Sequence, residues 1–413
     1  MTSRSKALRI LYNGSFSVLE PNKVLAQGGP SRFEDIFRKF FLKEDFFIIP
    51  FLFTESADTS VPYIRVKTRE GNLFNELVYC NDTRSLFQNK NPKRSLFLKT
   101  IQQTVKVIRS TLIQEKIDVV FLNGFSLNNW LLLYAAHKEK IPVVIQHAGI
   151  MKKEISRHMS FSSATKKIIY QMERDTIRWC SHHIFLNTFS KEVFIKLYNV
   201  KDQTKIISTI IPLPVPLTRN SKSIKKSIET NIKIGMVARW DSIKNHSAML
   251  RLATASTRPK NWTCHTVVHI PEASNIFTFP KKYKAAVYTH RPMLPENLTH
   301  FYQKMDIIFV PSNFDVSPTV VAEAFLAGVP VIISNNVGWQ NEFIECGLGD
   351  HIIATNSSGN QLVKIISRIL SQREMNMKKY IAMTNHILKI HKPDRVFNQY
   401  ALIFKKTVKS NTM

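Results

Sequence analysis

The sequence predicts an α/β protein made of two Rossmann-like domains that face each other across a cleft. Short apolar runs alternate with segments of helical periodicity in both halves of the chain, as expected for parallel sheets covered by helices. The chain has 413 residues, more than a single hydrophobic core usually organises. A proline-rich stretch separates the two alternating halves, which places the domain boundary near residue 215.

In the N-terminal half, the apolar runs predict strands at residues 7–12, 117–122, 142–146 and 183–186. Helical spacing predicts helices at residues 33–41, 97–115, 128–138 and 191–198. The segment 150–180 is basic and amphipathic, and two interpretations stay open for it: a solvated helix over the core, or a patch that binds a membrane surface. Its cations are Lys152, Lys153, Arg157, Lys166 and Lys167.

In the C-terminal half, the same alternation predicts strands at 232–237, 264–269, 285–288, 307–310 and 329–333, with helices at 246–255 and 319–327. Three prolines and a lysine-rich polar stretch before them indicate a linker. The expected division is therefore an N-terminal domain at 1–215, a linker at 216–227 and a C-terminal domain at 228–395. A last helix at 396–413 is expected to pack back on the N-terminal domain.

Charge is the unusual feature of the composition. Lys and Arg number 58 against 30 Asp and Glu, a formal net charge of +28, which favours an anionic partner such as a polyanion, an anionic membrane surface or an acidic ligand. Apolar residues at 44% and charged residues at 21% exclude a mainly disordered or fibrous protein. The basic residues are dispersed and form no legible RNA- or DNA-binding module, so no specific nucleic-acid partner is expected.

The sequence also argues against several site types. The four cysteines, Cys80, Cys180, Cys264 and Cys346, are scattered and indicate neither a metal site nor a disulfide framework. Neither G-x-G-x-x-G nor a P-loop is present, so the hypothesis of a dinucleotide-dependent oxidoreductase loses its main sequence support. The apolar runs fall short of the roughly 18 residues that a spanning helix needs, and no signal-peptide core follows the basic N-terminus. We therefore expect a cytoplasmic protein.

The most informative stretch runs from residue 310 to residue 332, where a strand leads through a loop into a helix. Ser317 is expected to cap this helix, with Pro318 in its first turn and Gly328 ending it. The backbone N–H groups and the dipole of such a helix start suit a diphosphate. Glu323, about one turn inside, is placed to accept hydrogen bonds from the vicinal hydroxyls of a ribose, and Asp315 from those of a sugar ring.

The spacing Asp315-x7-Glu323 resembles the Glu-x7-Glu signature of the retaining, family-4-like glycosyltransferases (glycosyl transferases group 1), which have the GT-B fold. The resemblance implies that Asp315 contacts the transferred hexose and that Glu323 binds the ribose of the donor nucleotide. It adds Ser317, Pro318 and Thr319 to the donor-binding residues. Aspartate is one methylene shorter than glutamate, which leaves open which sugar hydroxyl Asp315 reaches.

A second segment, residues 234–246, resembles the G-R-x4-K segment of the same family. The resemblance implies that Arg239 and Lys244 clamp the donor diphosphate and neutralise the leaving group, a role that needs no metal. Two weaker matches lie in the N-terminal half. Gly29, in a Gly-Gly pair, resembles the glycine loop that approaches the donor phosphate or the acceptor, and His147 resembles the histidine at a strand end that contacts the donor sugar near the reacting carbon.

Together these matches imply a hexosyltransferase that acts with retention of anomeric configuration, on a UDP- or GDP-sugar donor and without cofactor or metal. The implied acceptor is a glycan or a lipid-linked molecule of bacterial cell-surface polysaccharide or lipopolysaccharide synthesis. The implied location is cytoplasmic, with peripheral attachment to the inner face of the cell membrane. A basic nucleic-acid-binding protein and a catalytically silent transferase-like scaffold stay open as alternatives.

Overall fold

The computed structural model describes residues 7–13, 46–54, 63–67, 76–81, 94–155, 162–215, 231–269 and 280–411, together with Phe33, Glu34, Ile36, Phe37, Phe40 and Phe41. The described chain divides into two compact units. Unit 1 runs to Pro214 and resumes at Pro393, and unit 2 extends from Val215 to Lys392. The predicted linker at 216–227 and the predicted donor-loop residue Gly29 lie outside the described residues.

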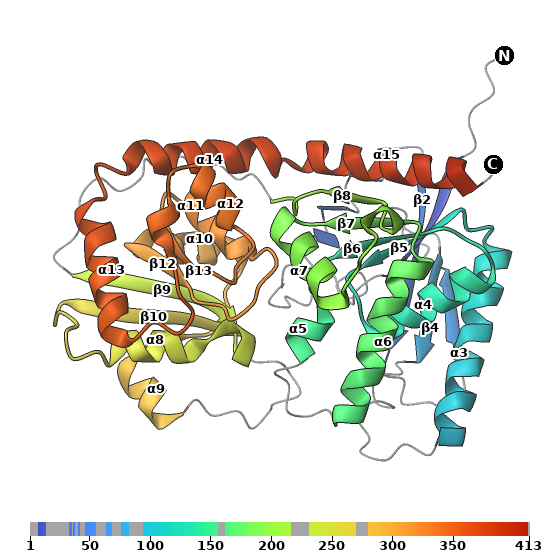
Figure 1. Ribbon diagram of the computed structural model, residues 1–413, viewed down its shortest axis with the longest axis horizontal. Coiled ribbons are helices and arrows are strands. Elements are labelled where there is room, and N and C mark those ends of the chain that lie inside the picture. Colours follow the sequence, from blue (N-terminus) through green and yellow to red (C-terminus); the bar gives the residue numbers. More distant parts are fainter. Residues whose placement is uncertain are drawn as a thin grey trace. The chain divides into compact units, whose positions relative to one another are not determined.

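Unit 1 contains an eight-stranded sheet in the order β3-β4-β2-β1-β5-β6-β7-β8 (Figure 1). All neighbouring strands are parallel except the β3–β4 pair, which is antiparallel. The strands are β1 (Leu8–Asn13), β2 (Phe46–Thr54), β3 (Tyr63–Lys67), β4 (Glu76–Asn81), β5 (Val119–Asn123), β6 (Val143–His147), β7 (His182–Phe185) and β8 (Ser208–Ile210). The helices are α3 (Arg94–Gln114), α4 (Leu127–Lys138), α5 (Met151–Ile155), α6 (Ser163–Trp179), α7 (Thr188–Tyr198) and α15 (Pro393–Asn411), with the 3-10 turn η2 (Gln203–Lys205).

Two apolar layers cover the unit 1 sheet. On one layer α3 and α4 pack against buried strand residues such as Leu11, Val120 and Leu122. The other layer is aromatic: the chain returns after unit 2 as α15, whose Phe397 and Phe404 contact rings that include Phe41. The C-terminal helix therefore belongs to the core of unit 1.

Unit 2 contains a six-stranded sheet in the order β11-β10-β9-β12-β13-β14, and all of its neighbouring strands are parallel. The strands are β9 (Ile232–Arg239), β10 (Trp262–His269), β11 (Tyr288–His290), β12 (Ile307–Val310), β13 (Val331–Ser334) and β14 (Ile352–Ile353). The helices are α8 (His246–Ala253), α9 (Lys281–Ala286), α10 (Pro295–Lys304), α11 (Thr319–Leu326), α12 (Gln340–Glu345), α13 (Gly359–Ser371) and α14 (Met377–Ile390). The 3-10 turns are η3 (Ser242–Lys244) and η5 (Gly349–His351).

Both faces of the unit 2 sheet are buried, because successive side chains of a strand point to opposite faces. Ile307 and Phe309 of β12 join the core cluster that includes α8 and α13. Ile308 and Val310 of the same strand join the cluster that includes α10, α11 and α14. The predicted fold class, α/β with two Rossmann-like units, is confirmed.

One of the strands predicted in unit 2 is misplaced. A strand was expected at 285–288, but residues 285 and 286 end α9 and the strand β11 covers only Tyr288–His290. The alternation of apolar residues could not distinguish the last turn of a short helix from an edge strand, because β11 has only three residues.

Candidate active site

The candidate site of unit 2 lies where its strand order reverses. The chain proceeds outward from β9 through β10 to β11, then returns to start β12 on the other side of β9. In doubly wound sheets, ligands bind beyond the carboxyl ends of the strands at such a switch point. Arg239 is the last residue of β9, Lys244 follows that strand, and Asp315 follows β12, so both of the motif segments predicted from the sequence reach this edge.

Hydrogen bonds join the two loops at the switch point. Asp241 caps the η3 turn, its carboxylate accepting from the Ile243 N–H at 2.9 Å. Asn313, in the loop after β12, donates its backbone N–H to the Ile243 carbonyl at 2.7 Å and its side-chain amide to the Ser242 carbonyl at 2.9 Å. The loop that carries Asp315 is therefore held directly against the turn that carries Lys244.

This arrangement brings Lys244 and Asp315 together. Lys244 Nζ donates to Asp315 Oδ2 at 2.5 Å, and both side chains are largely shielded, with exposed fractions of 20% and 13%. Arg239 lies further out: its side chain is 56% exposed, and its guanidinium is 3.9 Å from Asp241. The expected contact of Asp315 with a sugar hydroxyl stays a prediction, and in this structure its partner is the Lys244 ammonium.

A buried histidine supports the start of the same turn. The ring of His246 stacks on Trp240 with a centroid distance of 4.4 Å. Its Nε2 lies 2.8 Å from the Arg239 carbonyl, which can only accept, so Nε2 carries the proton and Nδ1 accepts from the Tyr283 hydroxyl at 3.3 Å. Burial lowers the pKa of His246 to about 4, so the ring is neutral and fixes the backbone at Arg239.

The helix after Asp315 begins at Thr319, as the sequence predicted, but its N-cap residue differs from the expected one. Pro318 is the N-cap of α11, and no side chain caps this end, so the predicted capping by Ser317 is wrong. Pro318 has the extended backbone of an N-cap residue, with φ −65° and ψ 119°, and Ser317 lies outside the helix as a result. Thr319 is the first helical residue, and its turn has backbone N–H groups that no side-chain cap satisfies.

The end of α11 agrees with the prediction. Gly328 has φ +79°, a left-handed conformation that glycine adopts without a Cβ penalty. The Gly328 N–H donates to the Phe325 carbonyl at 3.0 Å and the Val329 N–H to the Ala324 carbonyl at 2.9 Å, the two bonds of a Schellman motif. The helix is therefore short, and Glu323 lies in its middle.

Glu323 has a partner that sequence analysis missed. Its Oε2 accepts a hydrogen bond of 2.7 Å from the hydroxyl of Tyr302 on α10, which is buried with 1% exposure. Tyr302 lies at helical spacing among apolar residues, so its sequence signal was that of a core residue. The bond fixes one carboxylate oxygen of Glu323 within α11.

The predicted site residue His147 of unit 1 is fully buried at the end of β6. Its Nε2 lies 3.0 Å from Nδ1 of His183, and its ring stacks on Phe185 at 4.5 Å. Burial and the neighbouring His183 lower the pKa of His147 well below its usual range. The ring has no exposed surface in this conformation, so its contact with a donor sugar stays a prediction.

The loop after His147 is held by a buried carboxylate. Glu173 of α6 accepts from the backbone N–H groups of Met151 at 2.7 Å and Lys152 at 2.9 Å, and the Tyr198 hydroxyl donates to the same carboxylate. Lys152 Nζ donates to the Leu197 carbonyl at 2.8 Å. Lys152 is therefore engaged inside unit 1, and the binding of this basic segment to a membrane surface stays a prediction.

The fold and the switch-point residues of unit 2 define an α/β protein with a site suited to an anionic ligand that has hydroxyl groups. Residues 218–383, which lie within unit 2, match the family of glycosyl transferases group 1. The resemblance to this family that the sequence predicted is therefore confirmed over these residues of unit 2. No curated protein was found to match the sequence.

Solved structures of glycosyltransferases are similar over nearly the whole chain. Sucrose-phosphate synthase from Thermosynechococcus elongatus has a TM-score of 0.70 at 12% identity, covering 98% of this chain and 100% of that one. Anabaena HepE, solved with UDP and glucose, has a TM-score of 0.65 at 14% identity, covering 97% and 100%. An α,α-trehalose-phosphate synthase from Burkholderia xenovorans, solved with glucose-6-phosphate, has a TM-score of 0.65 at 10% identity, covering 96% and 99%. At such identities the likeness shows the fold, which is GT-B.

None of the helices in the described part of the chain is long and apolar enough to span a membrane.

Proposed function

We propose that this protein is a retaining hexosyltransferase that transfers a sugar from a UDP- or GDP-sugar to an acceptor hydroxyl. The observation that carries the proposal is the position of Lys244, Asp315 and the start of α11 at the switch point of a glycosyl transferases group 1 domain. A structural relative, Anabaena HepE, was solved with UDP and glucose, which supports a nucleotide-sugar donor here.

In this proposal the donor diphosphate lies against Lys244, Arg239 and the uncapped N-terminus of α11. As the bond from the sugar to the phosphate breaks, negative charge develops on the leaving diphosphate, and preorganised cations and N–H groups stabilise that charge. These groups supply the stabilisation that a metal would otherwise give, so we propose a metal-independent reaction without cofactor. Glu323, whose Oε2 accepts from Tyr302, binds the ribose in this proposal.

Asp315 forms the boundary between the diphosphate and the transferred sugar. Its carboxylate is paired with Lys244, so sugar hydroxyls and the ammonium share one acceptor group. Retention of configuration belongs to the proposal because the sequence resembles the retaining, family-4-like glycosyltransferases. The anomeric proton coupling of the first product formed would distinguish retention from inversion.

The donor test is a thermal-shift panel of UDP-, GDP-, ADP- and dTDP-sugars on the wild type and Glu323→Ala. A donor at 100 times its dissociation constant adds about 2.7 kcal/mol of apparent stability, which shifts the transition visibly. We expect one nucleotide series to raise the wild-type midpoint and Glu323→Ala to lose most of that rise. Glu345→Ala, which removes an exposed glutamate of α12, is the matched control and should keep the rise. A shift that Glu323→Ala retains in full would contradict the assignment of Glu323 to the ribose.

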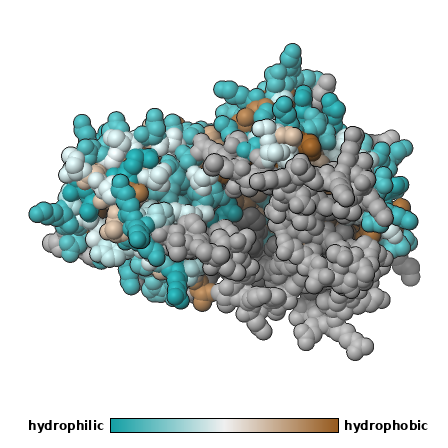
Figure 2. Space-filling model, turned by 90° about the horizontal axis from the view of Figure 1, so that it is seen from below, coloured by the Kyte–Doolittle hydropathy of each residue, from teal (hydrophilic) through white to brown (hydrophobic). Residues whose placement is uncertain are grey.

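We further propose that the acceptor belongs to bacterial cell-surface glycan synthesis and that the protein works in the cytoplasm at an anionic membrane surface. The support is the net charge of +28 together with the outer face of α6, where Lys167, Arg174 and Arg178 are exposed beside Ile168. Seen from below, the described surface is mainly hydrophilic with isolated apolar side chains, which favours adsorption over insertion (Figure 2).

Pelleting with vesicles tests the membrane proposal. Vesicles of phosphatidylglycerol and phosphatidylcholine are expected to sediment the wild type, and pure phosphatidylcholine vesicles are not. A Lys167→Glu, Arg174→Glu double variant should lose most of the binding, because each basic residue near the surface contributes about 1 kcal/mol. Lys260→Glu, a charge reversal on unit 2, is the control. Equal sedimentation with both vesicle types would remove the membrane part of the proposal.

A further inference from the structure

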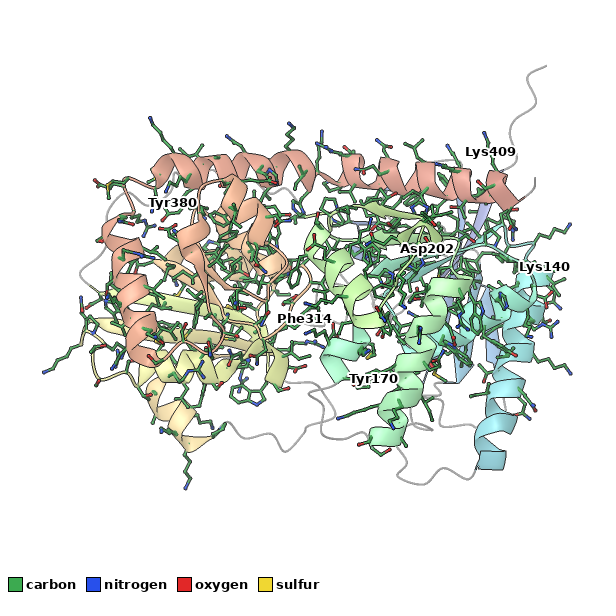
Figure 3. The ribbon with its side chains drawn as sticks, in the orientation of Figure 1. Lys140, Tyr170, Asp202, Phe314, Tyr380 and Lys409 are labelled. Carbon is green, nitrogen blue, oxygen red and sulfur yellow. The ribbon has the colours of Figure 1, made fainter. Side chains whose placement is uncertain are left out.

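The loop that carries Asp315 is paired with a second segment of unit 2, residues 336–339. The Asp315 N–H donates to the Asn336 carbonyl at 3.0 Å, and the Gly338 N–H donates to the Asp315 carbonyl at 2.9 Å. Asp315 and Val337 form an isolated parallel bridge. These backbone bonds hold the first part of the loop, before the chain reaches α11. Phe314, the residue before Asp315, marks this loop in Figure 3.

Trp339, at the end of that segment, holds the last part of the loop. Its indole Nε1 donates to the Pro318 carbonyl at 3.2 Å, and the side chain is buried with 2% exposure. Pro318 is the N-cap of α11, an end without a side-chain cap. The same carbonyl accepts the Val321 N–H at 3.2 Å, so the indole uses the second lone pair of the N-cap carbonyl.

The other contact of Trp339 lies where the chain leaves unit 2. Its ring stacks on His391 with a centroid distance of 4.8 Å and an interplanar angle of 19°. His391 is the C-cap of α14, one residue before the last residue of unit 2. Its carbonyl accepts the N–H of Val215, where the chain enters unit 2 after Pro214, at 3.0 Å. Among the described residues, the points where the chain enters unit 2 at Val215 and leaves it after Lys392 are therefore tied together beside Trp339.

We propose that Trp339 is a positioning residue for donor binding, and this inference rests on the proposed function. The indole N–H sets the Pro318 carbonyl, and with it the first-turn N–H groups of α11 and the direction of Asp315. Because the same ring packs on His391, the geometry of the donor loop depends on the segment that joins the two units. Donor binding and the conformation of the chain at His391 and Val215 are then coupled through the Trp339 side chain.

The competing explanation is that Trp339 only fills the core. It does lie in the apolar cluster with Val337 and Phe343. A filler role needs only the volume and apolar area of the ring, which phenylalanine largely supplies. A positioning role needs the N–H, which phenylalanine lacks. Trp339→Phe therefore separates the two explanations, since it keeps an aromatic ring facing His391 and leaves the Pro318 carbonyl without the indole donor.

The test measures binding of UDP and of GDP by calorimetry, with the thermal midpoint recorded for each protein. We expect Trp339→Phe to weaken binding of the preferred nucleotide about 5- to 30-fold, the effect of one well-placed hydrogen bond that orients several others. Trp262→Phe is the matched control, because Trp262 is also buried but packs in the other core cluster of unit 2. It should lower the thermal midpoint while leaving nucleotide affinity unchanged.

A second variant tests the coupling to the crossing segment. His391→Ala removes the stacked partner and leaves the indole N–H in place, and we expect it to weaken nucleotide binding by several-fold. The nucleotide affinity of the double variant Trp339→Phe, His391→Ala should fall by less than the product of the two single effects. Both substitutions act on the same set of contacts, so their effects are not independent.

The outcomes separate the inference from the function on which it rests. If the wild type binds neither nucleotide, the proposed function fails and this inference fails with it. If the wild type binds and Trp339→Phe binds equally well while its midpoint falls as in Trp262→Phe, the function stands and Trp339 is a core residue. If His391→Ala binds as the wild type does, the coupling to the crossing segment is wrong.

Discussion

Replacing Lys244 with methionine is expected to lower the transferase rate by about 10²- to 10³-fold while the protein stays folded. Lys244 is the cation that the fold holds most firmly at the switch point, because the η3 turn, Asn313 and Asp315 all fix its position. Its ammonium opposes the charge that develops on the leaving diphosphate. Methionine keeps much of the chain length and removes only the charge and its donors.

The rate of nucleoside diphosphate release measures this effect. Lys260→Met is the control, since Lys260 is an exposed lysine of the same unit and its loss should change the rate by less than about twofold. Lys244→Arg separates charge from geometry: the guanidinium keeps the charge but has a different shape, so partial activity is expected. A Lys244→Met protein with a wild-type rate would contradict the assignment of Lys244 to the leaving group.

Much of the unit 2 site was predictable from the sequence because its residues are close to the ends of strong apolar strands. Asp315 and Lys244 are 71 positions apart in the chain, yet each follows a strand, and neighbouring parallel strands end at one edge of a sheet. The alternation of apolar and helical segments likewise predicted the two Rossmann-like units. The order of strands and helices along the chain was therefore predictable from the sequence.

The partners of individual side chains could not be predicted in this way. Tyr302 contacts Glu323 from a different helix, and Trp339 reaches Pro318 across 21 positions, contacts that depend on how helices and loops pack on the sheet. Serine is a common N-cap residue, which led to the prediction for Ser317, but the N-cap of α11 is Pro318. The aromatic layer of unit 1 also depends on α15, which is distant in sequence from the strands that it covers.

The second large expected effect is on stability: Glu173→Leu should lower the free energy of unfolding of unit 1 by about 3 to 5 kcal/mol. Glu173 is fully buried and accepts from the N–H groups of Met151 and Lys152 and from the Tyr198 hydroxyl. Burial raises the pKa of Glu173, and these hydrogen bonds oppose the rise. Leucine is close in volume but would leave three donors, two part-buried N–H groups and the buried Tyr198 hydroxyl, without an acceptor.

The location of the effect distinguishes this explanation from a general loss of packing. Urea unfolding gives the total change, and hydrogen exchange at the amides of Met151 and Lys152 reports whether the start of α5 opens first. Glu192→Leu, an exposed position on α7, should stay within about 0.5 kcal/mol of the wild type. Glu173→Gln should fall between the two, because its carbonyl can accept one of the backbone N–H groups while its amide faces the other donors. If Glu173→Gln and Glu173→Leu were equally destabilised and α5 kept its protection, the carboxylate would not be what holds the loop after His147.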